Sequence, residues 1–281
     1  MDERTAGTSS GGGSRSGRNL PAAIAVGLGL ATLVLGSLYS PIKELFLLVM
    51  VGAVAVGVLE LIKAFAIRDI KVPAVPVVAG LVAMQAGAYW GGPLWLLATF
   101  AIFAVVLMVW RMFSDGTEGY VRDASASVLT LFYPAMLTSF AALLLKAHDG
   151  EHRVVIFIAV TVASDIGGYI AGVLFGRHQM TAISPKKTWE GFAGSLIACT
   201  AVGGWLVVWL LGGQIWQGAL IGALGALLAT VGDLVESMIK RDLGIKDLGT
   251  ILPGHGGLMD RLDSLVMTLV PAWLLMTLFF P

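Results

Sequence analysis

The sequence predicts an all-α protein with about nine membrane-spanning helices. Hydrophobic residues make up 57% of the 281-residue chain and charged residues only 13%, whereas soluble domains carry about 25% charged residues. Several long runs contain no charged residue, and a spanning helix needs about 20 mostly apolar residues. The runs do not alternate polar and apolar positions, as the strands of a membrane barrel would. These charge-free runs cover residues 19–42, 72–110, 124–145, 191–232 and 264–281.

The first 19 residues have a different composition from the rest of the chain. They are rich in Gly and Ser and contain Arg4, Arg15 and Arg18, which predicts a flexible tail. A secretory signal is the competing interpretation, because basic residues precede an apolar run. That run is longer than a typical signal core, so the tail is the preferred interpretation. Residues 20–281 are then expected to form one transmembrane domain.

Breaks within the apolar runs set the number of spans. The runs 72–110 and 191–232 are each long enough for two spans, and short turn sequences divide them at Gly91-Gly92-Pro93 and Gly212-Gly213-Gln214. Glycine and proline are the strongest local signals for a turn. The nine predicted spans are 20–39, 45–65, 72–90, 93–110, 125–145, 154–174, 191–211, 215–235 and 265–281.

The distribution of basic residues predicts the orientation of these spans. Fifteen of the 18 Lys and Arg residues lie in the N-terminal tail and in every second loop after it, which leaves three for the other side. Cytoplasmic loops of membrane proteins carry the excess of Lys and Arg. The sequence therefore predicts an inner-membrane protein with a cytoplasmic N-terminus and with the loops 175–190 and 236–264 facing the cytoplasm.

Three acidic residues interrupt apolar spans. An ionisable side chain inside a membrane segment is costly and marks either a function or a buried partner. Glu60 lies near the cytoplasmic end of its span and could pair with Lys63. Asp165 lies midway along a span whose neighbouring glycines allow close helix packing. Asp233 ends the eighth span and shares one helical face with Ser237. Asp165 and Asp233 are the stronger functional candidates.

Polar residues are densest between the last two predicted spans. Asp233 precedes this segment, and Asp260 and Asp263 end it. The segment starts and ends on the same membrane face, so these carboxylates can converge. Oxygen ligands suit Mg²⁺, which commonly binds one or two carboxylates together with phosphates and waters. The alternative is a salt-bridged cap in which Arg261 pairs with the neighbouring acids.

The cations of the same segment fit a phosphorylated substrate. Lys240, Arg241 and Lys246 could neutralise part of a nucleoside triphosphate. A loop that binds lipid headgroups is the alternative, but the interleaved acids favour a site for metal and phosphate. His255 lies in a glycine-rich turn and could donate to a phosphate or shuttle a proton. An exposed loop histidine without function is the competing interpretation.

A second predicted cytoplasmic loop has similar chemistry. Ser184, Lys186 and Lys187 precede Trp189 at the start of a span. Hydroxyl groups and paired lysines form a plausible phosphate clamp, whereas the tryptophan fits the membrane interface. Anchoring of the lysines at the membrane surface is the main alternative.

Two of these segments carry a resemblance to a known family. The stretch from Ser237 to Asp263, which includes Lys-Arg, Lys-Asp and His-Gly-Gly-Leu-Met-Asp-Arg-Leu-Asp, resembles the signature of the phosphatidate cytidylyltransferase (CDP-diacylglycerol synthase) family. The segment Ser-Pro-Lys-Lys-Thr-Trp-Glu-Gly and the preceding Asp165 are also similar to that family. The matching motifs cover about the last 120 residues, and the first five spans agree in hydropathy only.

The resemblance implies a reaction in which CTP and phosphatidate give CDP-diacylglycerol and pyrophosphate with the help of Mg²⁺. It implies membrane lipids as surroundings, a homodimer as the assembly, and no nucleic-acid partner. A CTP-dependent polyprenol kinase and an ion-coupled transporter remain as alternatives, although the long signature argues against the first. The roles implied are metal binding by Asp233, Asp260 and Asp263, catalysis by Asp233, Asp260, Lys240, Arg241 and His255, and substrate binding by Ser184, Lys186, Lys187, Lys246, Arg261, Asp165 and Ser237.

Overall fold

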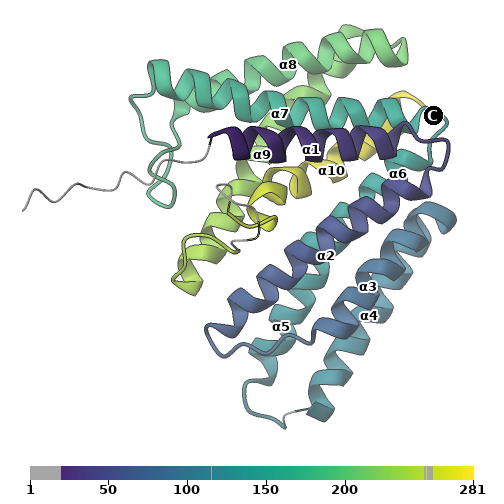
Figure 1. The fold of residues 1–281 in the computed structure, drawn as a ribbon, viewed down its shortest axis with the longest axis vertical. Coiled ribbons are helices and arrows are strands. Elements are labelled where there is room, and N and C mark those ends of the chain that lie inside the picture. Colours follow the sequence, from purple (N-terminus) through teal and green to yellow (C-terminus); the bar gives the residue numbers. More distant parts are fainter. Residues whose placement is uncertain (1–19, 115, 250, 252–255) are drawn as a thin grey trace, which may run out of the picture.

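The protein is a bundle of helices (Figure 1). The computed structural model describes residues 20–114, 116–249, 251 and 256–281. The predicted tail, residues 1–19, lies outside the described residues. Within these ranges every named element is a helix. The elements are α1 (Leu20–Leu38), α2 (Glu44–Ala66), α3 (Ala74–Ala86), η1 (Gly87–Gly91), α4 (Pro93–Ser114), α5 (Tyr120–Thr130), η2 (Leu131–Met136), α6 (Phe140–Lys146), α7 (Gly150–Phe175), α8 (Trp189–Leu211), α9 (Ile215–Leu243) and α10 (Met259–Phe279).

The predicted all-α membrane architecture is confirmed. In the described part of the chain, eight helices are long and apolar enough to cross a membrane. They coincide with the second to the ninth predicted spans, because α3 continues into η1 and α5 continues through η2 into α6. The first predicted span coincides with α1. Both predicted breaks also occur, with Gly92 and Gly212 at positive φ angles of 88° and 63°.

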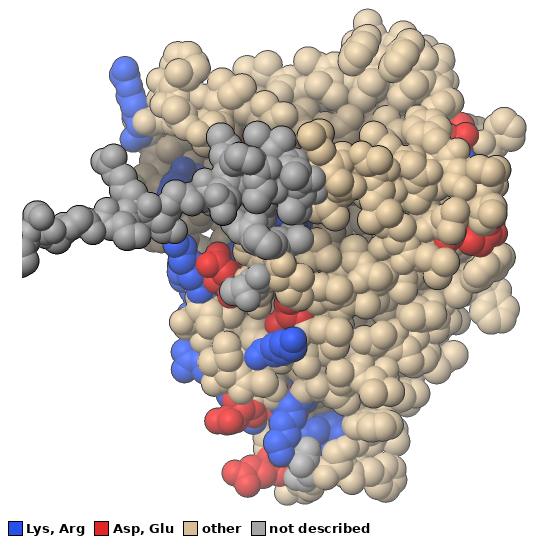
Figure 2. Space-filling view, viewed as in Figure 1, with Lys and Arg blue, Asp and Glu red and all other residues tan. Residues whose placement is uncertain are grey.

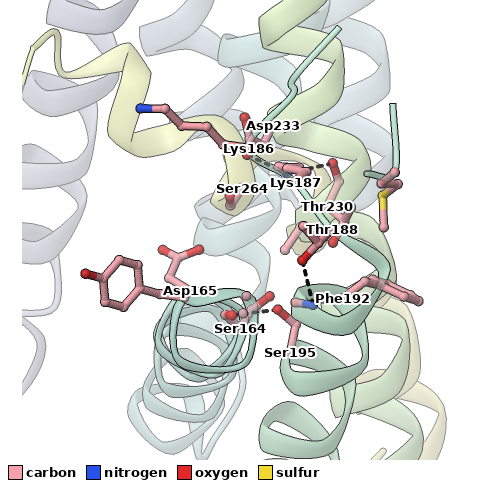
Figure 3. A pocket seen from close by; sticks show the side chains of 16 residues that line it. Ser164, Asp165, Lys186, Lys187, Thr188, Phe192, Ser195, Thr230, Asp233 and Ser264 are labelled. Atoms are coloured by element: carbon pink, nitrogen blue, oxygen red, sulfur yellow. Dashed lines mark hydrogen bonds and ion pairs between the residues drawn. The ribbon is translucent and has the colours of Figure 1, made fainter. Parts of the chain in front are cut away.

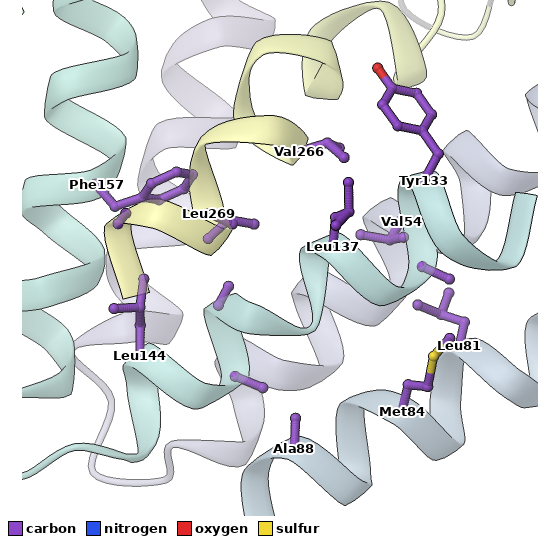
Figure 4. Packing of buried hydrophobic residues seen from close by; sticks show 14 of the residues in the cluster. Val54, Leu81, Met84, Ala88, Tyr133, Leu137, Leu144, Phe157, Val266 and Leu269 are labelled. Carbon is purple, nitrogen blue, oxygen red and sulfur yellow. The ribbon is translucent and has the colours of Figure 1, made fainter. Parts of the chain in front are cut away.

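The continuous helix formed by α5, η2 and α6 lies at the centre of the bundle. Its most apolar stretch is 72% buried inside the protein, compared with 11% for α4 at the periphery. Leu137 and Leu144 of this central helix belong to the main buried cluster. Figure 4 shows them beside Val266 and Leu269 of α10. The central helix therefore connects the N-terminal helices with the C-terminal group, in which α7, α8, α9 and α10 pack in sequence order.

Charged side chains gather at one end of the helices. Figure 2 shows most of them along one margin of the molecule, and Figure 1 places the loops 67–73, 116–119 and 176–188 and the residues 244–249 at the same end. Beside the loop 116–119, the buried Arg111 of α4 donates to the Asp123 carboxylate and to the carbonyls of Gly116 and Glu118. The arrangement agrees with the predicted alternation of basic and non-basic loops.

Two helices extend further than the hydropathy predicts. α9 continues to Leu243 and α10 starts at Met259, so the predicted site loop 236–264 is shorter than expected. Lys240 and Asp260 therefore lie on helices rather than in a loop. Polar residues end a hydrophobic run, but they do not necessarily end the helix. Glu, Met and Lys favour helix formation, so the backbone hydrogen bonds continue through them.

Candidate active site

A polar pocket of about 220 Å³ lies among α7, α8 and α9. Figure 3 shows Asp165 of α7, Asp233 of α9 and Lys187 of the loop 176–188 around it. Ser264 of α10 and Lys186 also line it. The pocket therefore brings together residues that are up to 100 positions apart in the sequence, among them the predicted site residues Asp165, Lys187 and Asp233.

An ion pair between Lys187 and Asp233 dominates the chemistry of the pocket. The Lys187 Nζ contacts the Asp233 carboxylate and also donates to the carbonyl of Thr230 at 3.4 Å. The other Asp233 oxygen accepts from the Ser237 hydroxyl at 3.4 Å. Both members of the ion pair are half-buried, with 22% and 33% of their side chains exposed. Water and a bound substrate can therefore still reach this pair.

Small residues allow α7 and α8 to approach closely beside the pocket. A Cβ added at Gly167 would lie 2.7 Å from the carbonyl oxygen of Gly194, and one at Gly194 would lie 2.6 Å from that of Gly167. Side chains larger than hydrogen would force the helices apart. In this contact the Ser195 hydroxyl donates to the Ser164 carbonyl at 2.7 Å. Asp165, one residue away, is therefore held next to the start of α8.

The loop 176–188 folds back on itself and places the lysines at the pocket. The Met180 amide donates to the Lys187 carbonyl at 2.8 Å, and the Lys187 amide donates to the Ser184 carbonyl at 3.0 Å. Thr188 then caps α8 by accepting from the Gly191 amide at 3.1 Å. Ser184 shapes this turn through its backbone and does not line the pocket. Lys186 is exposed at the edge and extends away from the ion pair (Figure 3).

A second polar cluster lies further along α9. The Lys240 Nζ contacts Glu236 at 2.7 Å and Asp260 at 2.8 Å. Glu236 is fully buried, and only 8% of the Asp260 side chain and 15% of the Lys240 side chain are exposed. The sequence analysis did not select Glu236. Its spacing of four residues from Lys240, which puts both on one helical face, was the signal that could have found it.

Asp260 also holds the polypeptide that precedes it. One of its oxygens accepts from the amides of Leu248 and Gly257, both at 3.0 Å. A Cβ at Gly257 would lie 2.8 Å from this same oxygen. The glycine is therefore needed for the carboxylate to approach the backbone. Asp260 thus holds the backbone at Leu248 and Gly257 as well as facing Lys240.

The pocket and the second cluster lie on the same stretch of α9. Asp233 and Lys240 are two turns apart, or roughly 10 Å along the helix axis. α10 crosses close to this stretch, because a Cβ at Gly232 would lie 2.4 Å from the Asp263 carbonyl. Asp263 is half-buried there, and one of its oxygens accepts from the Ser264 amide at 2.6 Å. The three predicted carboxylates therefore share one end of the protein.

The remaining predicted residues lie outside the pocket. Arg241, Lys246 and Arg261 are exposed on the surface around the second cluster. His255 lies outside the described residues. No structural role for these four residues follows from the pocket itself.

The carboxylates suit a metal ion that the substrate helps to hold. Within the described ranges no group of three potential ligands gathers as a complete protein site. Asp165 and Asp233 nevertheless line the same pocket, and Mg²⁺ is usually bound by one or two carboxylates with phosphates and waters. The donor set therefore fits Mg²⁺ bound together with a polyphosphate, and does not form a closed structural site.

Comparison with known sequences decides the family. The sequence model described as "Cytidylyltransferase family" matches residues 21–279, nearly the whole described chain. The chain belongs to the cytidylyltransferase family. The resemblance that the sequence motifs carry is thereby confirmed.

Two mycobacterial relatives match over most of their length, and a third relative matches over about half. The phosphatidate cytidylyltransferase of Mycobacterium leprae is 41% identical over 290 residues, which cover 94% of this chain and 89% of that protein. The protein of the same name from Mycobacterium bovis is 40% identical over 278 residues, covering 94% and 90%. One from Helicobacter pylori is 40% identical over 143 residues, covering 50% and 53%. All three are named phosphatidate cytidylyltransferase.

Proposed function

We propose that this protein is a phosphatidate cytidylyltransferase, which transfers the cytidylyl group of CTP to phosphatidate and releases pyrophosphate. The observation that carries the proposal is the pocket in which Lys187 faces Asp233 and Asp165, in a chain with full-length relatives of that name. The pocket lies at the charged end of a membrane bundle, where a lipid phosphate and a water-soluble nucleotide can meet.

The reaction is a substitution at phosphorus. A phosphate oxygen of phosphatidate forms a bond to the α-phosphorus of CTP, and the bond between the α-phosphorus and the oxygen that bridges to the β-phosphate breaks. Pyrophosphate leaves with that oxygen. A phosphomonoester is already largely ionised near pH 7, since its second pKa is about 6. The protein therefore needs no strong base, and positioning and charge neutralisation are the main catalytic contributions.

The size of the pocket indicates which part of the substrates it receives. Sites that enclose a whole small ligand measure roughly 300–1,000 Å³, whereas this pocket measures about 220 Å³. It accommodates the reacting phosphates and leaves the nucleoside and the acyl chains outside. Lys187 and Lys186 line the pocket and are proposed to bind those phosphates.

Asp233 is the first candidate for the metal, with Asp165 beside it and with Asp263 and Asp260 further along the same end. A bound Mg²⁺ would neutralise charge on the phosphate oxygens. Lys240 and its two carboxylate partners fix the neighbouring surface, on which Arg241 and Lys246 are proposed to bind the triphosphate. His255, which lies outside the described residues, is proposed to bind the triphosphate as well. Ser237 supports Asp233 through its hydroxyl group, and Ser184 and Arg261 are proposed at the edges of the substrate site.

The setting of the enzyme follows from the same architecture. We infer a multi-pass protein of the inner membrane, with the charged end and the pocket in the cytoplasm where CTP is available. Membrane lipids surround the helices, and a homodimer is the proposed assembly. Cross-linking of the protein in lipid nanodiscs tests the assembly, because a monomer at all concentrations would contradict it.

Position-specific labelling of CTP tests the proposed reaction. The purified protein in nanodiscs with Mg²⁺ and phosphatidate should transfer label from the α-phosphate of CTP to the lipid and release label from the γ-phosphate as pyrophosphate. A lipid kinase would instead place the γ-label on the lipid. If folded protein supplied with Mg²⁺ moves neither label, the proposed reaction is wrong.

A further inference from the structure

A buried carboxylate on α2 contacts the polar end of the C-terminal helices. Glu60 is only 3% exposed. Its Oε2 accepts from the backbone amide of Met259 at 2.9 Å, across 199 residues of sequence. Lys63, the partner that the sequence suggests, is exposed instead. Glu60 therefore points into the protein toward the start of α10.

The start of α10 needs an acceptor from elsewhere. The first amides of a helix have no partner within the helix, and the N-cap residue here is Leu258, whose side chain cannot accept a hydrogen bond. Glu60 provides the missing acceptor for the first helical residue. Its negative charge is also favourable at the positive end of the helix dipole.

Two glycines of the segment before α10 fit against the Glu60 carboxylate. A Cβ at Gly249 would lie 2.1 Å from Glu60 Oε1, and one at Gly257 would lie 2.7 Å from Oε2. The Gly257 Cβ would also lie 2.8 Å from the Asp260 carboxylate. Gly257 thus packs between two carboxylates, Glu60 from α2 and Asp260 from α10.

Burial of the second carboxylate oxygen of Glu60 lowers the stability of the fold. Glu60 Oε1 is buried and has no hydrogen-bond partner among the residues that the structure describes. A buried polar atom without a partner costs about 1–3 kcal/mol. An apolar side chain at this position would avoid that cost, so stability alone does not account for a glutamate there.

We propose that Glu60 is a positioning residue for the reaction. It holds the start of α10 together with Gly249 and Gly257, and through them it sets the place of Asp260 and of its partner Lys240. The N-terminal helices thereby control the geometry of the C-terminal site. The catalytic effect of Glu60 rests on the proposed function. Its effect on the local structure can be measured without an activity assay.

Hydrogen exchange of the protein in nanodiscs tests the structural part. Glu60→Ala should raise the exchange rate of amides within 245–262 by about 10-fold or more, because a hydrogen bond to a charged group contributes about 1.5–3 kcal/mol. Glu60→Gln keeps an acceptor for Met259 and should stay within about threefold of the wild type. The matched control is Gln85→Ala, since Gln85 is equally buried in α3 but bonds Thr138; it should leave this segment unchanged.

Kinetics test the catalytic part. In Glu60→Ala, kcat/KM for CTP should fall at least 10-fold per folded molecule, while KM for phosphatidate stays within about twofold and Glu60→Gln restores most of the loss. Unchanged exchange in 245–262, or an equal rise in all helices, would overturn the proposal. Wild-type kinetic constants in a Glu60→Ala protein whose exchange in 245–262 is raised would also overturn the proposal. An inactive wild type would refute the proposed function but not the exchange prediction.

Gly249→Ala disturbs the same contact at the glycine instead of at the glutamate. It keeps the proposal testable if Glu60→Ala does not fold. The added methyl group meets Glu60 Oε1, so local exchange should rise with Glu60 intact. In the double variant the alanine at position 60 leaves room for the methyl group, so the two effects should not add. Wild-type exchange in Gly249→Ala, or full additivity in a folded double variant, would also overturn the proposal.

Discussion

Two lysine–aspartate pairs differ in how far they are withdrawn from solvent. Lys240 and Asp260 are mostly buried, whereas Lys187 and Asp233 are half-exposed. Removing one partner of a buried pair costs about 3–5 kcal/mol, while exposed pairs contribute about 0–1 kcal/mol. Lys240 and Asp260 therefore form a fixed framework. Lys187 and Asp233 can exchange partners when a phosphate or a metal ion binds between them.

Replacing Asp260 tests the fixed framework. Asp260→Asn should lower kcat at least 100-fold, because Lys240 loses one of its two counter-charges and the amides of Leu248 and Gly257 lose a charged acceptor. Size-exclusion chromatography gives the folded fraction to which the rate is normalised. Asp242→Asn, at an exposed position on the same helix end, should keep wild-type turnover. Near-normal activity of Asp260→Asn would remove this residue from the mechanism.

Replacing Lys187 tests the exchangeable pair. Lys187→Ala should raise KM for at least one substrate about 10-fold, since the phosphate loses a cation inside the pocket. Lys186→Ala should have a smaller effect, because Lys186 lies at the exposed edge. Steady-state kinetics with each substrate varied in turn give both constants. Wild-type KM values for both substrates in Lys187→Ala would contradict a phosphate-binding role.

At the scale of elements, the close packing of α7 and α8 positions the pocket. Gly194 contacts the backbone of Gly167, whereas a Cβ at Gly52 in α2 would meet nothing within 4 Å. Gly194→Ala should destabilise the protein by about 1–3 kcal/mol through overpacking and lower the activity at least 10-fold. Gly52→Ala should change neither. Thermal unfolding in detergent and the activity assay check both variants, and equal behaviour of the two would show that this contact does not shape the pocket.

The helices could be predicted from the sequence because hydropathy reports what a bilayer requires. Charge-free runs and the glycine breaks gave nearly all spans, but the ends of α9 and α10 were misplaced where polar residues continue a helix. Which side chains contact one another was not predictable in the same way. The pattern indicated that Asp233, Asp260 and Lys240 share one end. It could not indicate that Glu60 caps α10, because that contact depends on packing between distant helices. Glu236 is different, since its spacing of four residues from Lys240 on α9 could have been recognised.

At the scale of the whole molecule, one end carries the charge and the site. The single cysteine, Cys199, is buried, so an introduced cysteine can report the orientation with little background. Asp247→Cys, in the segment after α9, should react with an impermeant thiol reagent only in inside-out membrane vesicles. Gln214→Cys, between α8 and α9, should react only from the opposite side. The reverse pattern would place the pocket outside the cytoplasm and contradict the proposed access of CTP.

The central claim is that carboxylates from distant helices hold a divalent ion against the polyphosphate of CTP. Electron paramagnetic resonance of Mn²⁺, in place of Mg²⁺, measures this directly with the protein in nanodiscs. We expect a protein-bound Mn²⁺ signal that requires CTP, and at least a 10-fold weaker affinity in Asp233→Asn, since the remaining ligands are phosphates and waters. Unchanged CTP-dependent Mn²⁺ affinity in both Asp233→Asn and Asp260→Asn would contradict the claim.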